Sequence, residues 1–116
     1  MFPALAEKRR EAAGRLSGGQ QQQLAIARAL MGAPKLLLLD EPSEGIQPSV
    51  VDEIAAVLSQ IAAERGMGLL LVEQNLDMAL AIASRIAFVA QGRIAASETT
   101  ETLRREPGLI ERHLLL

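Results

Sequence analysis

A short loop that could bind phosphate opens directly into a helical pattern near the N-terminus, and its residues are Leu16, Ser17, Gly18, Gly19 and Gln20. The start of a helix leaves several backbone N–H groups without partners and carries partial positive charge. The two glycines allow an anion to approach this backbone, and the serine hydroxyl can cap the helix or bond a phosphate oxygen. Taken alone, the loop fits a phosphate contact or an ordinary capped helix start.

A second group of residues with phosphate chemistry follows an apolar run. Four leucines at 36–39 predict a strand buried on both faces, and Asp40 and Glu41 come directly after them. Ligands of open parallel sheets bind at the carboxyl ends of strands. Because adjacent strand residues point in opposite directions, the two carboxylates should have different tasks. One can hold Mg²⁺, directly or through water, and the other can orient an attacking water; a solvated acid pair before Pro42 is the alternative.

Together these two groups resemble the ATP-binding-cassette (ABC) ATPases, in which a signature loop (LSGGQ here) is followed by a helix and by a Walker B strand (LLLLDEP here). The segments GGQQQQLAIARAL, DEPSEGIQPSVV and LLVEQNLDMAL look like the ATPase subunits of urea and branched-chain amino acid importers, and EGIQPS favours the urea-type branch. The resemblance covers nearly the whole chain and matches the C-terminal part of such a subunit.

The resemblance implies an α/β fold, the C-terminal part of a P-loop NTPase (ABC ATPase) fold. Its sheet would be mostly parallel and flanked by helices, with a C-terminal β-hairpin and short helices. Residues 1–31 would be the end of the helical subdomain that carries the signature loop. Residues 35–116 would be the C-terminal part of the catalytic core.

The resemblance also implies a mechanism. In ABC ATPases two subunits, as a homo- or heterodimer, face head to tail, and ATP lies between the phosphate loop of one subunit and the signature loop of the other. The signature loop at 16–20 would contact the γ-phosphate of ATP held by the partner. Asp40 would act on Mg²⁺, through water, and Glu41 would polarise the attacking water. Phosphoryl transfer depends chiefly on positioning and charge stabilisation, so these roles are sufficient in kind.

Two positions depart from the residues that are usual in this superfamily. The switch position, usually histidine, is Gln74, whose amide can donate to a phosphate oxygen or hold a water but cannot carry a proton as imidazole can. The D-loop comprises Glu44, Gly45, Ile46 and Gln47, and the last of these stands where aspartate is usual. The resemblance gives Gln74 a catalytic role. For both glutamines, an ordinary polar loop residue is the alternative.

The sequence contains no G-x-x-x-x-G-K-[ST] phosphate loop. By the resemblance, this loop would lie upstream of Met1, so the chain is expected to be the C-terminal piece of a larger subunit, as a truncated gene model, a partial sequence or a remnant. Such a piece is expected to expose strand edges and apolar surface. It should bind ATP weakly and hydrolyse none.

Hydrophobic periodicity and breaker residues predict the elements that position these groups. Helices are expected over about Pro3–Arg15, over Gln20–Met31, from Pro48 to a stop at Gly66, after a cap at Asn75, and after a cap at Thr99 or Thr100, with a break at Pro107-Gly108. Strands are expected at 36–39 and 68–72, and a hairpin at 86–90 and 93–97 around Gln91-Gly92. The order strand, helix, strand, helix predicts a parallel sheet. His113, the only histidine, is expected on the surface.

The composition narrows the class of protein. The 116 residues suffice for one small domain, and 49% hydrophobic residues exclude a disordered tail. A net charge of −2 provides no basic surface for nucleic acid or an anionic membrane, and the lack of cysteine excludes disulfides and cysteine metal sites. No apolar run approaches the roughly 20 residues of a membrane helix. We therefore expect a soluble, cytosolic protein, and the resemblance implies that it associates peripherally with the inner face of the cell membrane.

The sequence is compatible with three functions. The first is the ATP-binding and ATP-hydrolysing subunit of an importer for urea or branched-chain amino acids. It would use ATP and Mg²⁺, pair with a second ABC ATPase subunit and with transmembrane permease subunits, and serve a periplasmic or extracellular substrate-binding protein indirectly. The second is an ABC ATPase of DNA repair or translation, which the importer-like motifs disfavour. The third is a catalytically silent module that only contributes its signature loop to an intact partner.

Overall fold

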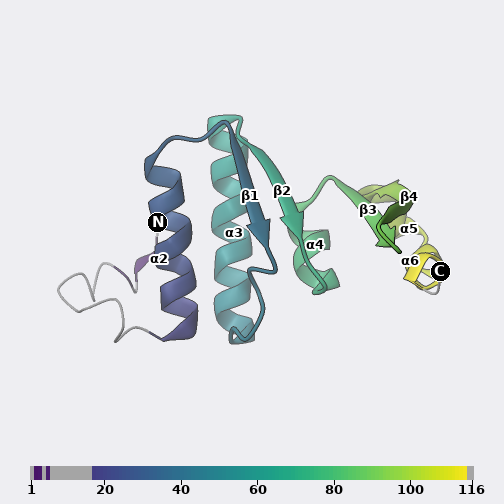
Figure 1. The fold of residues 1–116 in the computed structure, drawn as a ribbon, viewed down its shortest axis with the longest axis horizontal. Helices are drawn as coiled ribbons and strands as arrows, with labels where there is room; N and C mark the ends of the chain where they lie inside the picture. The colour runs from purple at the N-terminus through teal and green to yellow at the C-terminus, as the bar shows by residue number, and fades with distance from the viewer. Residues whose placement is uncertain (1, 4, 6–16, 115–116) are drawn as a thin grey trace. The chain divides into compact units, whose positions relative to one another are not determined.

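The computed structural model describes residues 2–3, 5 and 17–114, and these residues belong to two compact units, Met1–Ile82 and Ala83–Leu116 (Figure 1). The helix expected over about Pro3–Arg15 lies for the most part outside the described residues, as does Leu16. Within the described ranges, no helix has both the length and the apolar composition that crossing a bilayer requires.

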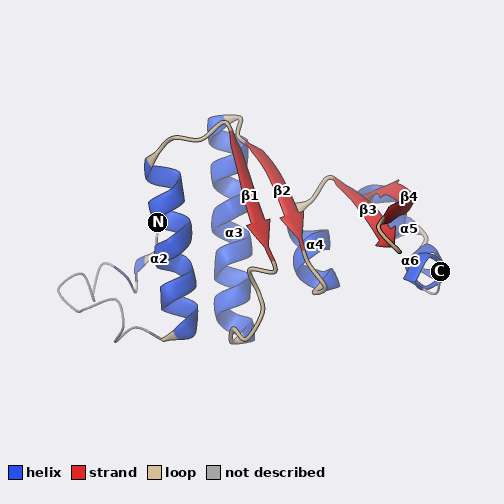
Figure 2. Ribbon diagram, viewed as in Figure 1, coloured by secondary structure: helices blue, strands red, loops and turns tan. Residues whose placement is uncertain are grey.

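The first unit is built around a two-stranded parallel sheet. Its elements are α2 (Gly18–Met31), β1 (Leu36–Asp40), α3 (Pro48–Arg65), β2 (Gly68–Val72) and α4 (Leu76–Ile82) (Figure 2). β1 pairs with β2 in the register Leu36↔Gly68 to Asp40↔Val72. The predicted strand–helix–strand–helix order and the parallel pairing are confirmed.

One face of this sheet is packed against helices. The core joins Leu37 of β1 to apolar side chains of three helices, namely Ile26 and Leu30 of α2, Val51, Ile54, Ala55, Leu58 and Ile61 of α3, and Met78 of α4. The α3 residues recur at helical spacing, as predicted, and so form one continuous buried stripe. Burial of this stripe holds α3 against the strands and fixes the loops at its two ends.

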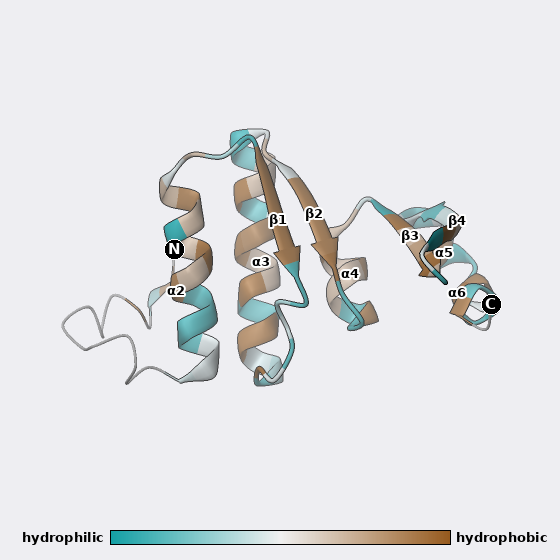
Figure 3. Ribbon diagram, in the orientation of Figure 1, coloured by the Kyte–Doolittle hydropathy of each residue, from teal (hydrophilic) through white to brown (hydrophobic). Residues whose placement is uncertain are grey.

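The opposite face of the sheet is open, which corrects one prediction. The leucine run was expected to be buried on both faces, but Leu36 and Leu38 are 57% and 63% exposed, and Leu70 and Val72 beside them are 58% and 55% exposed. These side chains share one face because strand residues alternate. The described helices cover the other face, so the exposed leucines and valine form an apolar surface (Figure 3). The expectation of exposed apolar surface is confirmed.

Local sequence signals set the helix ends. Pro48 occupies the first turn of α3, and Gly66 ends that helix in the left-handed conformation with φ 61°. The Asn75 side chain caps α4, because its Oδ1 accepts a bond from the Met78 N–H at 3.0 Å. All three roles agree with the predictions.

The second unit is a hairpin followed by two short helices. β3 (Arg85–Ala90) pairs antiparallel with β4 (Arg93–Thr99), and α5 (Thr100–Arg105) and α6 (Gly108–Leu114) follow. Gln91 and Gly92 have φ 52° and 74°, as a two-residue turn of this kind requires. Thr99 caps α5, since its Oγ1 accepts a bond from the Thr102 N–H at 3.1 Å.

His113 is not a free surface residue, contrary to the sequence prediction. Its side chain is only 13% exposed, and its Nε2 lies 3.4 Å from a carboxylate oxygen of Glu98. Its ring centre lies 5.0 Å from that of Phe88. The helical turn after Gly108 therefore places the imidazole against the hairpin, a contact that isolated periodicity does not reveal.

A buried polar side chain in α2 generates a stability prediction. Gln23 is 1% exposed, and its Oε1 has no hydrogen-bond partner among the described residues. An unsatisfied buried polar group costs about 1–3 kcal/mol. We therefore expect Gln23→Met, which keeps the length of the side chain, to raise the free energy of unfolding of the 116-residue chain by about 1 kcal/mol. Urea denaturation measures this value. Gln22→Met, at a half-buried neighbouring position, is the control, and a lower stability for Gln23→Met than for Gln22→Met would contradict the prediction.

Candidate functional site

The loops that follow β1 and β2 leave the sheet at the same edge. The Glu41 N–H donates to the Val72 carbonyl at 2.6 Å, one residue beyond the end of β1. A pocket of about 430 Å³ lies at this edge. Its lining residues are polar and come from both loops: Glu41, Ser43, Glu44, Glu73, Gln74 and Asn75. The structure thus brings together the predicted site residues Glu41, Glu44 and Gln74, and adds Glu73 to them.

Glu73 joins the two loops through its carboxylate. Its Oε2 accepts a bond from the Ser43 N–H at 3.2 Å, in the loop after β1. Its Oε1 accepts bonds from the Gln74 and Asn75 N–H groups, both at 3.1 Å, in the loop after β2. The sequence indicates only that Glu73 follows a strand, because acceptance of backbone bonds from a distant loop leaves no pattern in the residue order.

Glu41 departs from the strand geometry on which its sequence interpretation relied. β1 ends at Asp40, and Glu41 has φ 46°, in the left-handed region that non-glycine residues seldom occupy. Strand alternation therefore does not determine where the Glu41 side chain points relative to Asp40. Residues in such conformations cluster at functional sites. Here Glu41 contributes to the pocket lining, whereas Asp40 is exposed at the strand end.

Neighbouring acids make the site electronegative. The carboxylate of Glu44 raises the pKa of Glu41 above its ordinary value of 4.5, and slight desolvation together with the charges of Asp40 and Glu73 raises this pKa further. No group of three or more metal-ligating side chains occurs in the described part of the chain. Mg²⁺ commonly uses one or two carboxylates together with substrate phosphates and waters. The neighbouring carboxylates at the end of β1 are residues that could hold such a cation together with phosphate and water ligands.

The start of α2 is closed by a capping box. Ser17 Oγ accepts a bond from the Gln20 N–H at 3.1 Å, and Gln20 Oε1 accepts one from the Ser17 N–H at 3.1 Å. Ser17 and Gly18 are exposed, so the serine hydroxyl and the neighbouring backbone face solvent. Leu16, the first residue of the predicted loop, lies outside the described residues.

The two glycines of this loop have different surroundings. A Cβ at Gly19 would lie 2.8 Å from Val50 Cγ1 and 3.4 Å from Ile46 Cγ2, whereas a Cβ at Gly18 would meet nothing closer than Ile46 Cδ1 at 4.0 Å. Gly19 therefore allows close packing of α2 on α3 and on Ile46 in the loop before α3. Of these two glycines, only Gly18 is exposed to solvent.

The helix start and the acids lie at one end of the first unit without sharing a pocket. The N-termini of α2 and α3 and the carboxyl ends of β1 and β2 lie at that end (Figure 1). Ser17 is not among the residues that line the pocket with Glu41. In the segment expected to be the D-loop, Gly45 has φ 69°, Ile46 is half-buried, and Gln47 is the residue before α3.

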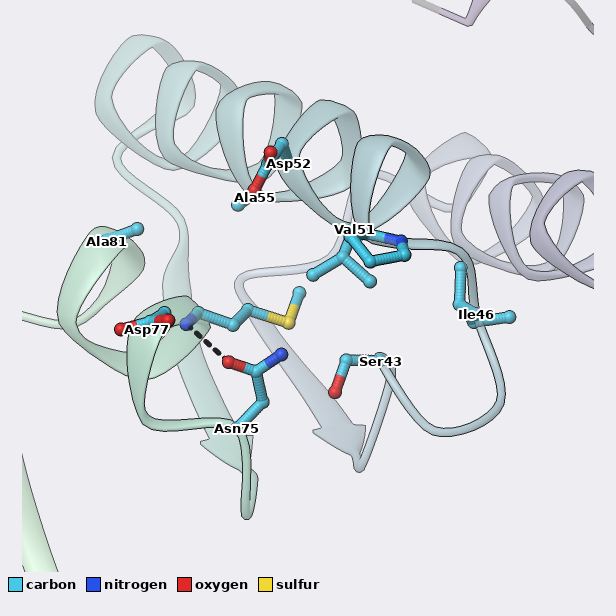
Figure 4. A pocket seen from close by; sticks show the side chains of 10 residues that line it. Ser43, Ile46, Val51, Asp52, Ala55, Asn75, Asp77 and Ala81 are labelled. Carbon is cyan, nitrogen blue, oxygen red and sulfur yellow. Dashed lines mark hydrogen bonds between the residues drawn. The ribbon is translucent and has the colours of Figure 1, made fainter.

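A smaller pocket of about 190 Å³ lies between the start of α3 and α4 (Figure 4). Ser43 and Asn75 line both pockets. Met78 and Val51 are both buried and both line this pocket, and the Asn75 cap bond to the Met78 N–H is drawn there as a dashed line (Figure 4).

The glycine contacts generate a packing prediction. Because its new Cβ would overlap Val50, Gly19→Ala should lower the free energy of unfolding by about 1–2 kcal/mol relative to Gly18→Ala. Chemical denaturation of the 116-residue chain compares this matched pair of variants. Adding Val50→Ala to Gly19→Ala should recover part of the loss. Equal stabilities for the two alanine variants would show that the close approach at Gly19 is not required.

The acid cluster generates a pH prediction. Because the folded-state pKa of Glu41 is raised, ionised Glu41 disfavours the folded state above that pKa, and the penalty disappears as the pH falls through it. Glu41→Gln should therefore raise the melting temperature at pH 7, and the difference from wild type should shrink as the pH falls to about 4. Thermal melts of the chain in a chelating buffer measure this. The exposed Glu106→Gln serves as the control. A difference in melting temperature between Glu41→Gln and wild type that does not change with pH would contradict the raised pKa of Glu41.

Comparisons with known proteins show what this chain is similar to. Residues 2–44 match the family model for ABC transporters. The high-affinity branched-chain amino acid transport ATP-binding protein BraG of Pseudomonas aeruginosa is 44% identical over 114 residues, which are 98% of this chain and 48% of that protein. A crystal structure of an ATP-binding cassette of an ABC transporter in its ADP conformation matches with a TM-score of 0.74 and 30% identity, over 90% of this chain and 42% of the other.

A dimeric ATP-binding cassette in a post-hydrolysis state, bound to ADP and Pi, matches with a TM-score of 0.69 and 31% identity, over 75% of this chain and 37% of the other. The chain thus spans less than half the length of each protein with which it is compared here. These similarities in sequence and structure support an ABC ATP-binding subunit, and the chain has the fold of the C-terminal part of an ATP-binding cassette.

Proposed function

We propose that this chain is part of the ATP-hydrolysing subunit of an ABC importer for branched-chain amino acids or urea. The observation that carries the proposal is the convergence of Glu41, Glu73 and Gln74 on one pocket at the carboxyl ends of two parallel strands. The similarity to BraG supports the branched-chain amino acid substrate. The motif EGIQPS supports the urea alternative.

The signature loop would contact ATP that is held mainly by a partner subunit. The exposed start of α2 presents the Ser17 hydroxyl and the Gly18 backbone to an anion. The Ser17 oxygen accepts a bond from Gln20, so its own proton stays available for donation to a phosphate oxygen. Leu16, Gly19 and Gln20 would support this surface, Gly19 by packing and Gln20 through the capping box.

The acids at the end of β1 would act on the nucleotide bound in their own subunit. Asp40 would hold Mg²⁺, through water, and the ion when bound would neutralise charge on the phosphates. Glu41 would accept a hydrogen bond from the attacking water, and its raised pKa makes it a stronger base than an ordinary glutamate. The Gln74 amide, at the same pocket, would donate to a phosphate oxygen or hold the water in place.

The proposal also assigns the subdomains of the chain and the proteins with which it would assemble. Residues up to 31 would belong to the helical subdomain, and 35–116 to the catalytic core. A second ATPase subunit would pair head to tail with this one, in keeping with the dimeric cassette that the chain resembles. Transmembrane permease subunits would hold the dimer at the cytoplasmic face of the membrane. A substrate-binding protein would act indirectly, and no nucleic acid would be bound.

A second candidate is the silent module. The sequence contains no G-x-x-x-x-G-K-[ST] motif, so its own residues do not include the lysine and glycine-rich loop that hold ATP phosphates in this superfamily. Such a module would contribute only its signature loop to an intact partner.

The two candidates differ in the importance of Glu41. In a full-length subunit that contains this sequence, Glu41→Gln should keep ATP binding and lower the rate of ATP turnover at least about 100-fold, because the group that polarises the water is lost. A phosphate-release assay with a separate nucleotide-binding measurement tests this. Glu106→Gln should retain turnover, and normal turnover in Glu41→Gln would remove the catalytic role. The 116-residue chain alone, assayed in parallel with Mg-ATP, should show no turnover.

A further inference from the structure

Glu73 occupies the junction between the two loops of the site. Its carboxylate is divided between them, with Oε2 on the Ser43 N–H and Oε1 on the Gln74 and Asn75 N–H groups. The last backbone bond between the two strand ends joins the Glu41 N–H to Val72. The Ser43 bond to Glu73 therefore extends the connection between the two loops to the third residue after β1.

We propose that Glu73 is a positioning residue for ATP hydrolysis, which holds Glu41 and Gln74 in register with each other. The inference rests on the proposed function of these two residues. Gln74 is held directly, through its own N–H. Glu41 is held through Ser43, two residues away, with the fully buried Pro42 between them as a second anchor.

The chemistry of the acceptor explains why a carboxylate stands at this position. Both oxygens of an ionised carboxylate accept hydrogen bonds, and bonds to a charged acceptor are stronger than neutral ones. A glutamine at position 73 would offer one oxygen and one NH₂ group. Its NH₂ would then face an N–H donor, either at Ser43 or at the pair in the loop after β2. Glu73→Gln therefore keeps the size of the side chain while it disconnects one loop.

Amide hydrogen exchange on the 116-residue chain tests the connection without any assumption about function. In Glu73→Gln, exchange at Ser43 or at Gln74 and Asn75 should be at least about tenfold faster than in the wild type. Amides of the buried stripe of α3 should keep their rates. Asp77→Asn is the matched control, because it removes an exposed carboxylate from the start of α4 and should leave the three amides unchanged. Unchanged rates at all three amides in Glu73→Gln would overturn the proposal.

Kinetics of a full-length subunit test the positioning role. Glu73→Gln should lower kcat about tenfold or more and leave the KM for ATP within about twofold, because the affected groups act on the attacking water rather than on nucleotide binding. Glu73→Ala should lower kcat further. A kcat equal to wild type in Glu73→Gln overturns the positioning role even if exchange is faster. A wild-type subunit without ATPase activity would instead refute the proposed function, and the exchange experiment would still decide whether Glu73 joins the loops.

Discussion

Parallel pairing of β1 with β2 places Asp40 beside Val72 in the register, and the chemistry of the site depends on this pairing. Both strands end at the same edge, so the acids after β1 and the polar residues after β2 line one pocket. A shift of one residue would turn the alternating side chains over and separate the carboxylates from Gln74. Burial of Leu37 and of the apolar stripe of α3 opposes such a shift, since it would expose core side chains to water.

The packing of α2 places its N-terminus against the same set of loops. Gly19 lies against Val50 at the start of α3 and against Ile46, five residues after Glu41. Movement of the start of α2 would therefore displace the loop 41–47, which follows Asp40. This contact is local and apolar, whereas the link from Glu73 is polar and charged. The first unit thus connects the loop 41–47 with α2 on one side and with the loop after β2 on the other.

Much of this arrangement could be predicted from the residues. Periodicity and breakers such as Pro48, Gly66 and Gln91-Gly92 gave the elements, because they act over a few neighbouring residues. The leucine run was assigned correctly to a strand. The predicted burial of both its faces was wrong, because burial depends on which elements cover each face. The predicted surface position of His113 was wrong for the same reason, since its neighbours Phe88 and Glu98 are distant in the sequence.

The same distinction between local signals and distant contacts applies to the site residues. Motif spacing identified Glu41 and Gln74 as candidates, but the left-handed backbone of Glu41 and the bonds of Glu73 arise only when the strands pair. The contact between Gly19 and Val50 likewise reflects a helix packing distance that composition does not encode. Short-range signals in the sequence therefore name the candidates, and long-range contacts decide their geometry.

In the proposed dimer, the signature loop and the Walker B acids of one subunit act on different nucleotides. Mixed dimers of full-length subunits test it most directly. If one subunit carries Ser17→Arg and the other Glu41→Gln, one nucleotide site keeps both wild-type elements, so turnover should persist. If both substitutions lie in one subunit opposite a wild-type partner, each site has one defect, and turnover should be lost. The reverse outcome, with turnover only in the second dimer, would show that the two elements act on the same nucleotide from one chain.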